Sequence, residues 1–308
     1  MTTGLALRRV GVVVHPTRDT ANALSTVARF TEAHGLELVQ LTDGAAQREV
    51  AAPGRLEAGD LVLALGGDGT VLAALRAAAE TNTPVLGVAC GSVGAMSAVK
   101  AEELAGALDR FVAGNWTPRR LPALAIEVPG AADDWAANDL VLVRRGAGQL
   151  AVDVTVDEEL YVRLAGDGVI VATPLGSSAY SMAAGGPVLA AGTEAIVCTP
   201  IAMHGGCGPP LVVPAGATVT IDVHPSFAGF YAEVDGQRRP LDDRRFRLRL
   251  HPSRLVLVTF GRAGHGLAGL RRRGLIADSP RVLARDERAT APREDGDARP
   301  GVTDRRPD

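Results

Sequence analysis

Two kinds of segment alternate in the first third of the chain. Continuous apolar runs, typical of buried strands, lie at residues 8–15, 36–41, 61–65 and 84–89. Amphipathic segments, typical of helices, lie between or after them, at residues 21–35, 71–80 and 102–114. Apolar strands separated by amphipathic helices predict a parallel sheet with helices on both faces.

The pattern changes near residue 119, where short strand-like runs replace this alternation. These runs lie at residues 122–128, 139–145, 151–156, 169–174, 218–223 and 254–260. Few helical windows separate them, which predicts a second, β-rich domain. We therefore expect an α/β fold with a Rossmann-like N-terminal domain and a β-rich C-terminal domain.

The predicted domain bounds follow this change of pattern. The α/β domain is expected over residues 1–118 and the β-rich domain over residues 119–262. Residues 263–277 are expected to form a C-terminal helix that packs back on the N-terminal domain. Residues 278–308 are about half charged and contain few apolar residues, so we expect a disordered tail.

Composition limits the function only broadly. With 46% hydrophobic and 22% charged residues, the 308-residue chain has the composition of a soluble globular protein. Its formal net charge of -3 gives no whole-chain attraction to nucleic acid or to an anionic membrane, so neither partner is expected. No apolar run approaches the ~18–20 residues of a membrane-spanning helix, and the N-terminus does not fit a secretory signal.

Cysteine and lysine usage adds two expectations. Cys90, Cys198 and Cys207 form no paired motif, which favours a reducing, cytoplasmic location. The only lysine is Lys100, and it follows Ala-Val rather than the glycine that a P-loop requires. A P-loop nucleotide site is therefore excluded.

A glycine-rich loop carries the first chemical signal. Residues 66–70 read GGDGT and stand where a predicted strand turns into a predicted helix. Ligands of parallel α/β sheets bind outside the carboxyl ends of the strands, and amide groups at a helix start attract phosphate. A phosphate group would repel the Asp68 carboxylate unless a cation lies between them or the carboxylate takes a proton from a hydroxyl group. Binding a cation and accepting a proton are both roles in phosphoryl transfer. The alternative is that Asp68 only caps the helix.

A second loop, residues 167–187, reads DGVIVATPLGSSAYSMAAGGP. The hydroxyl groups of Ser177, Ser178 and Tyr180 suit sugar hydroxyls or phosphate, although an ordinary strand–turn–helix would also explain them. Two loops rich in glycine and small polar residues, one in each domain, indicate an active site in a cleft between the domains.

These stretches together resemble the NAD kinase family. The resemblance rests on GGDGT at 66–70, AND at 137–139, the 167–187 block, TPIAMH at 199–204 and DGQ at 235–237. The matches occur in family order over about residues 8–260. GGDGT alone is shared with lipid kinases and, as GGDGS, with phosphofructokinases, whereas the 167–187 block is strongly specific.

The resemblance implies transfer of the ATP γ-phosphoryl group, with Mg²⁺ or another divalent metal, to the 2′-hydroxyl of the adenosine ribose of NAD. It implies that Asp68 is the proton acceptor or a metal-linked carboxylate. It also implies that NAD contacts Asp68, Gly69, Asn138, Asp139, Asp167, Ser178, Ala179, Tyr180 and Gln237. Family members are usually dimers or tetramers. The sequence leaves open whether NADH or inorganic polyphosphate is accepted.

Several positions depart from the family pattern. Ala89, Ala165 and Ala183 stand where polar residues are frequent, Asp139 replaces the usual glutamate, and Ser178 replaces a threonine. Each lost polar contact costs about 1 kcal/mol. The chain is therefore interpreted as a divergent member with weaker affinity or altered donor use.

Three alternatives remain at this point. A lipid or small-alcohol kinase would share GGDGT but would not bind NAD. A dinucleotide-binding regulatory protein would keep the cleft and lack turnover. A Rossmann oxidoreductase is disfavoured because HPTRDT, and not GxGxxG, follows the first strand.

Overall fold

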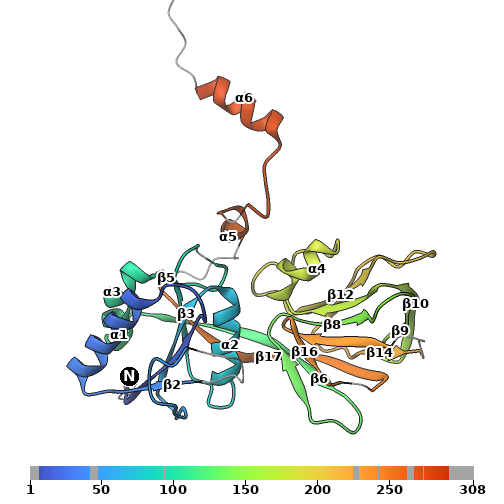
Figure 1. Ribbon diagram of the computed structural model, residues 1–308. Coiled ribbons are helices and arrows are strands. Elements are labelled where there is room, and N and C mark those ends of the chain that lie inside the picture. The colour runs from blue at the N-terminus through green and yellow to red at the C-terminus, as the bar shows by residue number, and fades with distance from the viewer. Residues whose placement is uncertain are drawn as a thin grey trace, which may run out of the picture.

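The N-terminal third alternates strands and helices, as the apolar pattern predicts (Figure 1). The computed structural model describes residues 7–41, 48–92, 94–224, 229–241, 243–261, 267–272 and 274–290. The first elements are β1 (Arg9–Val14), α1 (Ala21–His34), β2 (Glu37–Gln40), β3 (Leu61–Gly66), α2 (Asp68–Ala78), β4 (Val85–Ala89), β5 (Val99–Lys100), the 3₁₀ turn η1 (Ala101–Glu103) and α3 (Leu104–Val112).

Both faces of this sheet are buried, because helices cover each one. Strands β2, β1, β3 and β4 pair in parallel. Along β1, Val12 and Val14 belong to the apolar cluster that contains α1 and α3 side chains. Val13 points the other way and belongs to the cluster that contains α2 side chains. This alternation explains why the strands read as continuous apolar runs.

The second part of the chain is built from strands, as predicted. Its elements are β6 (Thr117–Glu127), β7 (Asp134–Ala136), β8 (Asp139–Arg144), β9 (Leu150–Val156), β10 (Glu159–Gly166), β11 (Gly168–Ala172), the 3₁₀ turn η2 (Gly176–Ser178), α4 (Tyr180–Ala183), β12 (Ala195–Ile201), β13 (Leu211–Pro214), β14 (Val219–Val223), β15 (Phe230–Val234), β16 (Gln237–Arg239) and β17 (Arg245–Thr259). A six-stranded sheet has the order β13-β12-β11-β8-β15-β16. Its strands share one apolar cluster with β9, β14 and β17 of the other sheet.

Two long strands join the parts into one continuous sheet (Figure 1). The start of β17 pairs with β14, whereas Leu257 near its end pairs with Val85 of β4. Strand β6 pairs with β17 on both sides of an irregularity between His251 and Leu255. The predicted boundary between residues 118 and 119 therefore falls inside β6. The two-part fold class is confirmed, and the domain bounds stay a prediction.

The C-terminal region departs from the expectation in one place. Helix α5 (Leu267–Arg272) lies within the predicted helix, and its Leu270 is buried. Residues 280–290, expected to belong to a disordered tail, form helix α6 (Pro280–Thr290), so the structure differs from the expectation here. Pro280 suits a first helical position, and alanine, leucine and arginine favour helix even in a strongly charged segment. Residues 291–308 lie outside the described residues.

The described helices include none that is long and apolar enough to span a membrane.

Candidate functional site

The GGDGT loop joins the end of β3 to the start of α2. Gly67 is the N-cap residue and Asp68 lies in the first helical turn. The Asp68 carboxylate accepts backbone N–H bonds from Ala95 at 2.9 Å and from Met96 at 3.1 Å. These two bonds fix the carboxylate at the carboxyl end of β3, where ligands of parallel sheets bind.

Glycines allow the chain to approach this carboxylate closely. A side chain at Gly94 would overlap the Asp68 carboxylate, and one at Gly66 would overlap the Thr70 hydroxyl. Gly69 differs, because it is exposed and no atom lies within 4 Å of the place that its Cβ would occupy. The backbone at Gly69 therefore faces open space, as a contact to a ligand requires.

The loop 137–139 is held by a carboxylate that the sequence analysis did not select. Asp235 accepts backbone N–H bonds from Ala137 at 3.0 Å, Asn138 at 2.7 Å and Asp139 at 3.4 Å. Asp235 has a left-handed φ of 52° and begins the Asp-Gly turn between β15 and β16. An Asp-Gly pair between apolar strands is a strong hairpin signal, but it does not reveal the partner of the Asp side chain.

Gln237 lies just beyond this turn. It is exposed and pairs through its backbone with Val234 at the start of β16. That Gln237 contacts the dinucleotide stays a prediction. Asp235 is the residue of the DGQ motif that touches the 137–139 loop.

Asp139 is buried beside this turn, with 5% of its surface exposed. Burial, together with the nearby charges of Asp235 and Glu233, raises the pKa of its carboxyl group to about 7. A carboxyl group with this pKa exchanges a proton near neutral pH. It can therefore either donate or accept a hydrogen bond to a hydroxyl group.

Arg76 links α2 to the same region. Its guanidinium donates to the Asp134 carboxylate at 2.9 Å and to the Trp135 carbonyl at 2.7 Å. It lies 3.4 Å from the Asp235 carboxylate and stacks on the Trp135 ring at 4.6 Å. The helix that begins at Asp68 is thus tied to the residues that hold Asn138 and Asp139.

The 167–187 block meets the 137–139 loop through Thr173 and Gly176. The Thr173 hydroxyl donates to the Ala137 carbonyl at 2.6 Å, and its N–H donates to the Asn138 carbonyl at 2.8 Å. A side chain at Gly176 would overlap the Asn138 backbone. Leu175 packs against the apolar cluster of α2. Three sequence motifs, far apart along the chain, therefore lie in one region.

The hydroxyl residues of this block have different surroundings. Ser177 is fully buried, donates to the Pro174 carbonyl at 2.8 Å and accepts the Leu189 N–H at 2.9 Å. Both bonds serve the turn, as the strand–turn–helix alternative implies for this residue. Ser178 is half-buried and bonds the Leu175 carbonyl at 3.2 Å. Ala179 is half-buried, and Tyr180 at the start of α4 is 45% exposed.

Asp167 lies at the other end of this block, before β11. Its carboxylate accepts a hydrogen bond from Arg144 Nε at 2.6 Å and lies 4.0 Å from His204 Nε2. His204 Nδ1 lies 2.7 Å from the Gln149 amide nitrogen. Arg144 was not selected from the sequence, since only the fold brings β8 beside β11.

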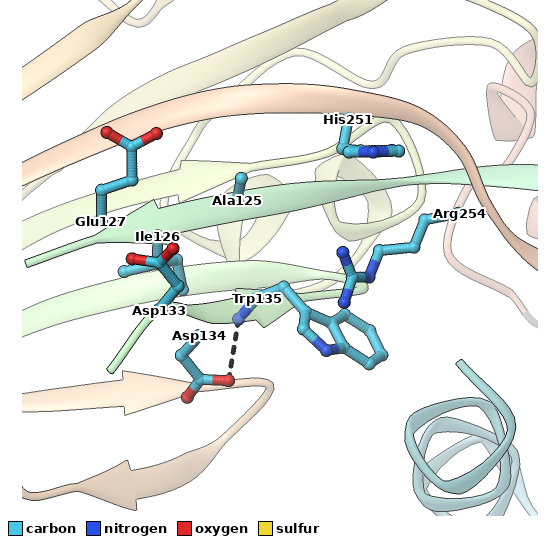
Figure 2. Close-up of a pocket in the computed structure, with 8 residues that line it drawn as sticks. All are labelled: Ala125, Ile126, Glu127, Asp133, Asp134, Trp135, His251 and Arg254. Atoms are coloured by element: carbon cyan, nitrogen blue, oxygen red, sulfur yellow. Dashed lines mark hydrogen bonds between the residues drawn. The ribbon is translucent and has the colours of Figure 1, made fainter. Parts of the chain in front are cut away.

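A pocket of about 140 Å³ opens beside β6, β7 and β17 (Figure 2). Figure 2 shows the Trp135 ring at this pocket with the Arg254 guanidinium beside it. Its lining residues are Ala125, Ile126, Glu127, Asp133, Asp134, Trp135, His251 and Arg254. None of them is a predicted site residue, so this pocket is not the predicted cleft.

Side chains that could bind a metal ion do not cluster in the part of the chain that the structure describes. No three His, Cys, Asp or Glu side chains there gather as a metal cage. Asp68 is the predicted metal-linked residue, and it would supply a single carboxylate. Mg²⁺ is usually bound by one or two carboxylates together with substrate phosphates, so this donor set fits a nucleotide-held ion and not a resident one.

Comparison with known families gives two matches that together cover most of the folded chain. The ATP-NAD kinase N-terminal domain matches residues 10–116, and the ATP-NAD kinase C-terminal domain matches residues 137–254. The segment between the two matches contains β6, the strand that joins the two parts of the fold.

Three curated relatives are named NAD kinase. The protein of Methanothermobacter thermautotrophicus is 32% identical over 243 residues, which is 75% of this chain and 83% of the relative. That of Moorella thermoacetica is 35% identical over 69% of each chain. That of Bifidobacterium longum subsp. infantis is 33% identical over 64% of this chain, which spans 61% of that relative's length.

Two solved structures share the fold. Yeast NADH kinase complexed with NADH has a TM-score of 0.74, with 20% identity and 89% of each chain covered. An NAD kinase from Archaeoglobus fulgidus in complex with ATP has a TM-score of 0.66, with 22% identity, covering 87% of this chain and 100% of that one.

Proposed function

Since the chain belongs to the ATP-NAD kinase family, we propose that it transfers the γ-phosphoryl group of ATP to the 2′-hydroxyl of the adenosine ribose of NAD, giving NADP. The observation that carries this proposal is the meeting of three motifs. GGDGT reaches the 137–139 loop through Arg76 and Asp235, and Thr173 joins that loop to the 167–187 block.

The proposed step is an in-line displacement. The ribose 2′-oxygen forms a bond to the γ-phosphorus, and the bond from that phosphorus to the β–γ bridging oxygen breaks. The bridging oxygen leaves with its electron pair as part of ADP. The hydroxyl proton passes to the Asp68 carboxylate, which the Ala95 and Met96 amides hold in place. Such reactions depend mainly on positioning and on charge neutralisation.

The remaining residues orient the dinucleotide in this proposal. Asn138 and the buried Asp139 hydrogen-bond its base and ribose hydroxyls. Asp167, Ser178, Ala179 and Tyr180 line the rest of the cleft, and Gly69 offers its exposed backbone. Gln237, exposed at the start of β16, is included as a further contact to the dinucleotide.

Magnesium would be held by the phosphates of ATP; a bond to Asp68 is the alternative to its role as proton acceptor. Bound there, it would neutralise phosphate charge.

We also propose a cytoplasmic homodimer or homotetramer, as the family usually forms. Inorganic polyphosphate is an alternative donor that the assay below includes.

The test is a coupled assay of NADP formation with NAD, MgCl₂ and either ATP or polyphosphate. Replacing a general base typically lowers the rate about 10²–10⁴-fold. We therefore expect Asp68→Asn to lose at least about 10²-fold in kcat. The exposed Asp109→Asn on α3 is the matched control and should keep wild-type activity. Near wild-type NADP formation by a folded Asp68→Asn protein would contradict the role of Asp68. NAD binding without any turnover by the wild type would favour the regulatory alternative.

A further inference from the structure

Arg18 lies at the ligand-binding edge of the N-terminal sheet. Its segment, HPTRDT, directly follows β1, and the Arg18 N–H donates to His15 Nδ1 at 3.1 Å. The guanidinium donates to the carbonyl of Cys90, the residue directly after β4, at 3.4 Å. It also lies against Gly67, the residue directly after β3. Arg18 therefore touches the carboxyl ends of three adjacent parallel strands.

Two glycines make room for this guanidinium. A Cβ at Gly67 would lie 3.3 Å from Arg18 Nη1, and a Cβ at Gly91 would lie at the same distance. Gly91 also has a left-handed φ of 124°. Gly67 is the N-cap of α2, so the guanidinium lies beside the first turn that carries Asp68. Both the guanidinium and the helix N-terminus favour an anion at this place.

Arg18 forms no ion pair with any residue that the structure describes. The neighbouring carboxylate, Asp19, instead accepts the Ala21 N–H at 2.9 Å at the start of α1. Arg9, at the opposite end of β1, shows the usual arrangement, since carboxylates of Glu37, Glu57 and Asp60 lie within 4 Å of it. A half-buried arginine without a carboxylate partner, at the edge where ligands bind, lacks the anion that would balance it.

We propose that Arg18 is a catalytic residue that binds the polyphosphate end of the phosphoryl donor. This inference rests on the proposed function. The guanidinium donates hydrogen bonds to oxygens of the γ-phosphoryl group and of the departing β-phosphate. It thereby stabilises the charge that grows as the β–γ bridging oxygen leaves with its electron pair. Arg18 gains and loses no proton, because the ribose hydroxyl proton passes to Asp68. In a chain without a P-loop lysine, Arg18 supplies the fixed positive charge.

Binding to inorganic tripolyphosphate tests this role without turnover. We expect Arg18→Ala to weaken tripolyphosphate binding at least about 10-fold and to leave NAD binding unchanged, because the lost contacts are to phosphate alone. Arg18→Lys should restore part of the affinity, since a point charge replaces the planar fork. The matched control is Arg29→Ala, which removes an exposed arginine from α1 and should bind as the wild type does.

Steady-state kinetics give the second readout. Removing one hydrogen-bond donor to a developing charge costs about 10²–10³-fold in kcat. The kcat of Arg18→Ala should therefore be lower by that factor, with its KM for NAD unchanged. If Arg18→Ala has the same kcat as Arg29→Ala and binds tripolyphosphate as the wild type does, the proposal is overturned. A wild-type protein that does not bind tripolyphosphate would also overturn it. If the wild type forms no NADP, the proposed function fails, and the tripolyphosphate comparison alone still decides whether Arg18 binds phosphate.

Discussion

Asp139 shows how a single buried side chain couples the site to pH. Burial raises the pKa of its carboxyl group from 3.8 to about 7. The folded protein therefore holds this proton more tightly than the unfolded chain does. The stability that results is fully present below the ordinary pKa and is lost as pH rises through about 7.

We expect Asp139→Asn to reduce the fall in stability between about pH 5 and about pH 8. An amide does not titrate, so the variant lacks the cost of charging a buried carboxyl group. That cost is about 1.4 kcal/mol for every tenfold change in proton affinity. Urea unfolding of wild type and variant across this pH range measures the difference. Parallel stability profiles for the two proteins would show that Asp139 does not titrate as described.

Asp235 is a second residue whose role is local and testable. We expect Asp235→Asn to weaken NAD binding, because the carboxylate that accepts three backbone N–H bonds positions Asn138 and Asp139. Hydrogen bonds to a charged group contribute about 1.5–3 kcal/mol, so the loss should be about 10-fold or more. Isothermal titration calorimetry with NAD measures it.

Asp157→Asn is the matched control for this prediction. Asp157 also has a left-handed φ, of 46°, and accepts one backbone N–H bond, from Thr218, in the β9–β10 turn. The control should bind NAD like the wild type. Equal affinities for all three proteins would contradict the positioning role of Asp235.

At the scale of elements, helix α2 connects the two halves of the site. The sequence predicts this helix from its apolar spacing, although the helix begins at Asp68, three residues earlier than the predicted run. The sequence does not reveal what Arg76 contacts, because Asp134, Trp135 and Asp235 lie far from it along the chain. Arg18, Arg144 and Asp235 were missed for the same reason.

Edge and hairpin strands were also harder to predict than buried parallel ones. Strands β1, β3 and β4 are apolar on both faces and therefore stand out in the sequence. Strand β10 interleaves Glu159 and Arg163 with apolar residues and has a register irregularity after Leu160, so its pattern is weak. The pairing partners of such strands are set by the folded structure and cannot be identified from the local sequence pattern.

We expect Arg76→Ala to lower the free energy of unfolding by about 2 kcal/mol and to raise the KM for NAD. The variant leaves Asp134 and Asp235 without the guanidinium that lies between them. Urea unfolding and steady-state kinetics measure the two effects, with Arg29→Ala as the exposed arginine control. A variant as stable as the control, with an unchanged KM, would show that Arg76 does not couple α2 to the 137–139 loop.

At the scale of the whole molecule, one sheet passes through both parts of the fold. Strand β17 pairs with β14 at its start and with β4 near its end, and β6 follows it along both. Val258 of β17 is buried in the same cluster as α1 and α3. The N-terminal part therefore depends on a strand from the end of the folded chain.

We expect a fragment of residues 1–118 not to fold cooperatively, because it lacks β17 and almost all of β6. The edge of β4 and the apolar cluster around Val258 would be exposed to water. Circular dichroism during urea unfolding tests this expectation. A sharp, cooperative transition of the fragment would show that the predicted N-terminal domain is an independent folding unit.

The most direct measurement for the whole account is ³¹P NMR of the protein with NAD, ATP and MgCl₂. We expect a phosphomonoester signal, from the new 2′-phosphate, to grow in step with ADP. Wild type and Asp109→Asn should both produce it, whereas Asp68→Asn should not. Release of inorganic phosphate without that signal, or equal growth of the signal with Asp68→Asn, would contradict phosphoryl transfer to the ribose beside Asp68.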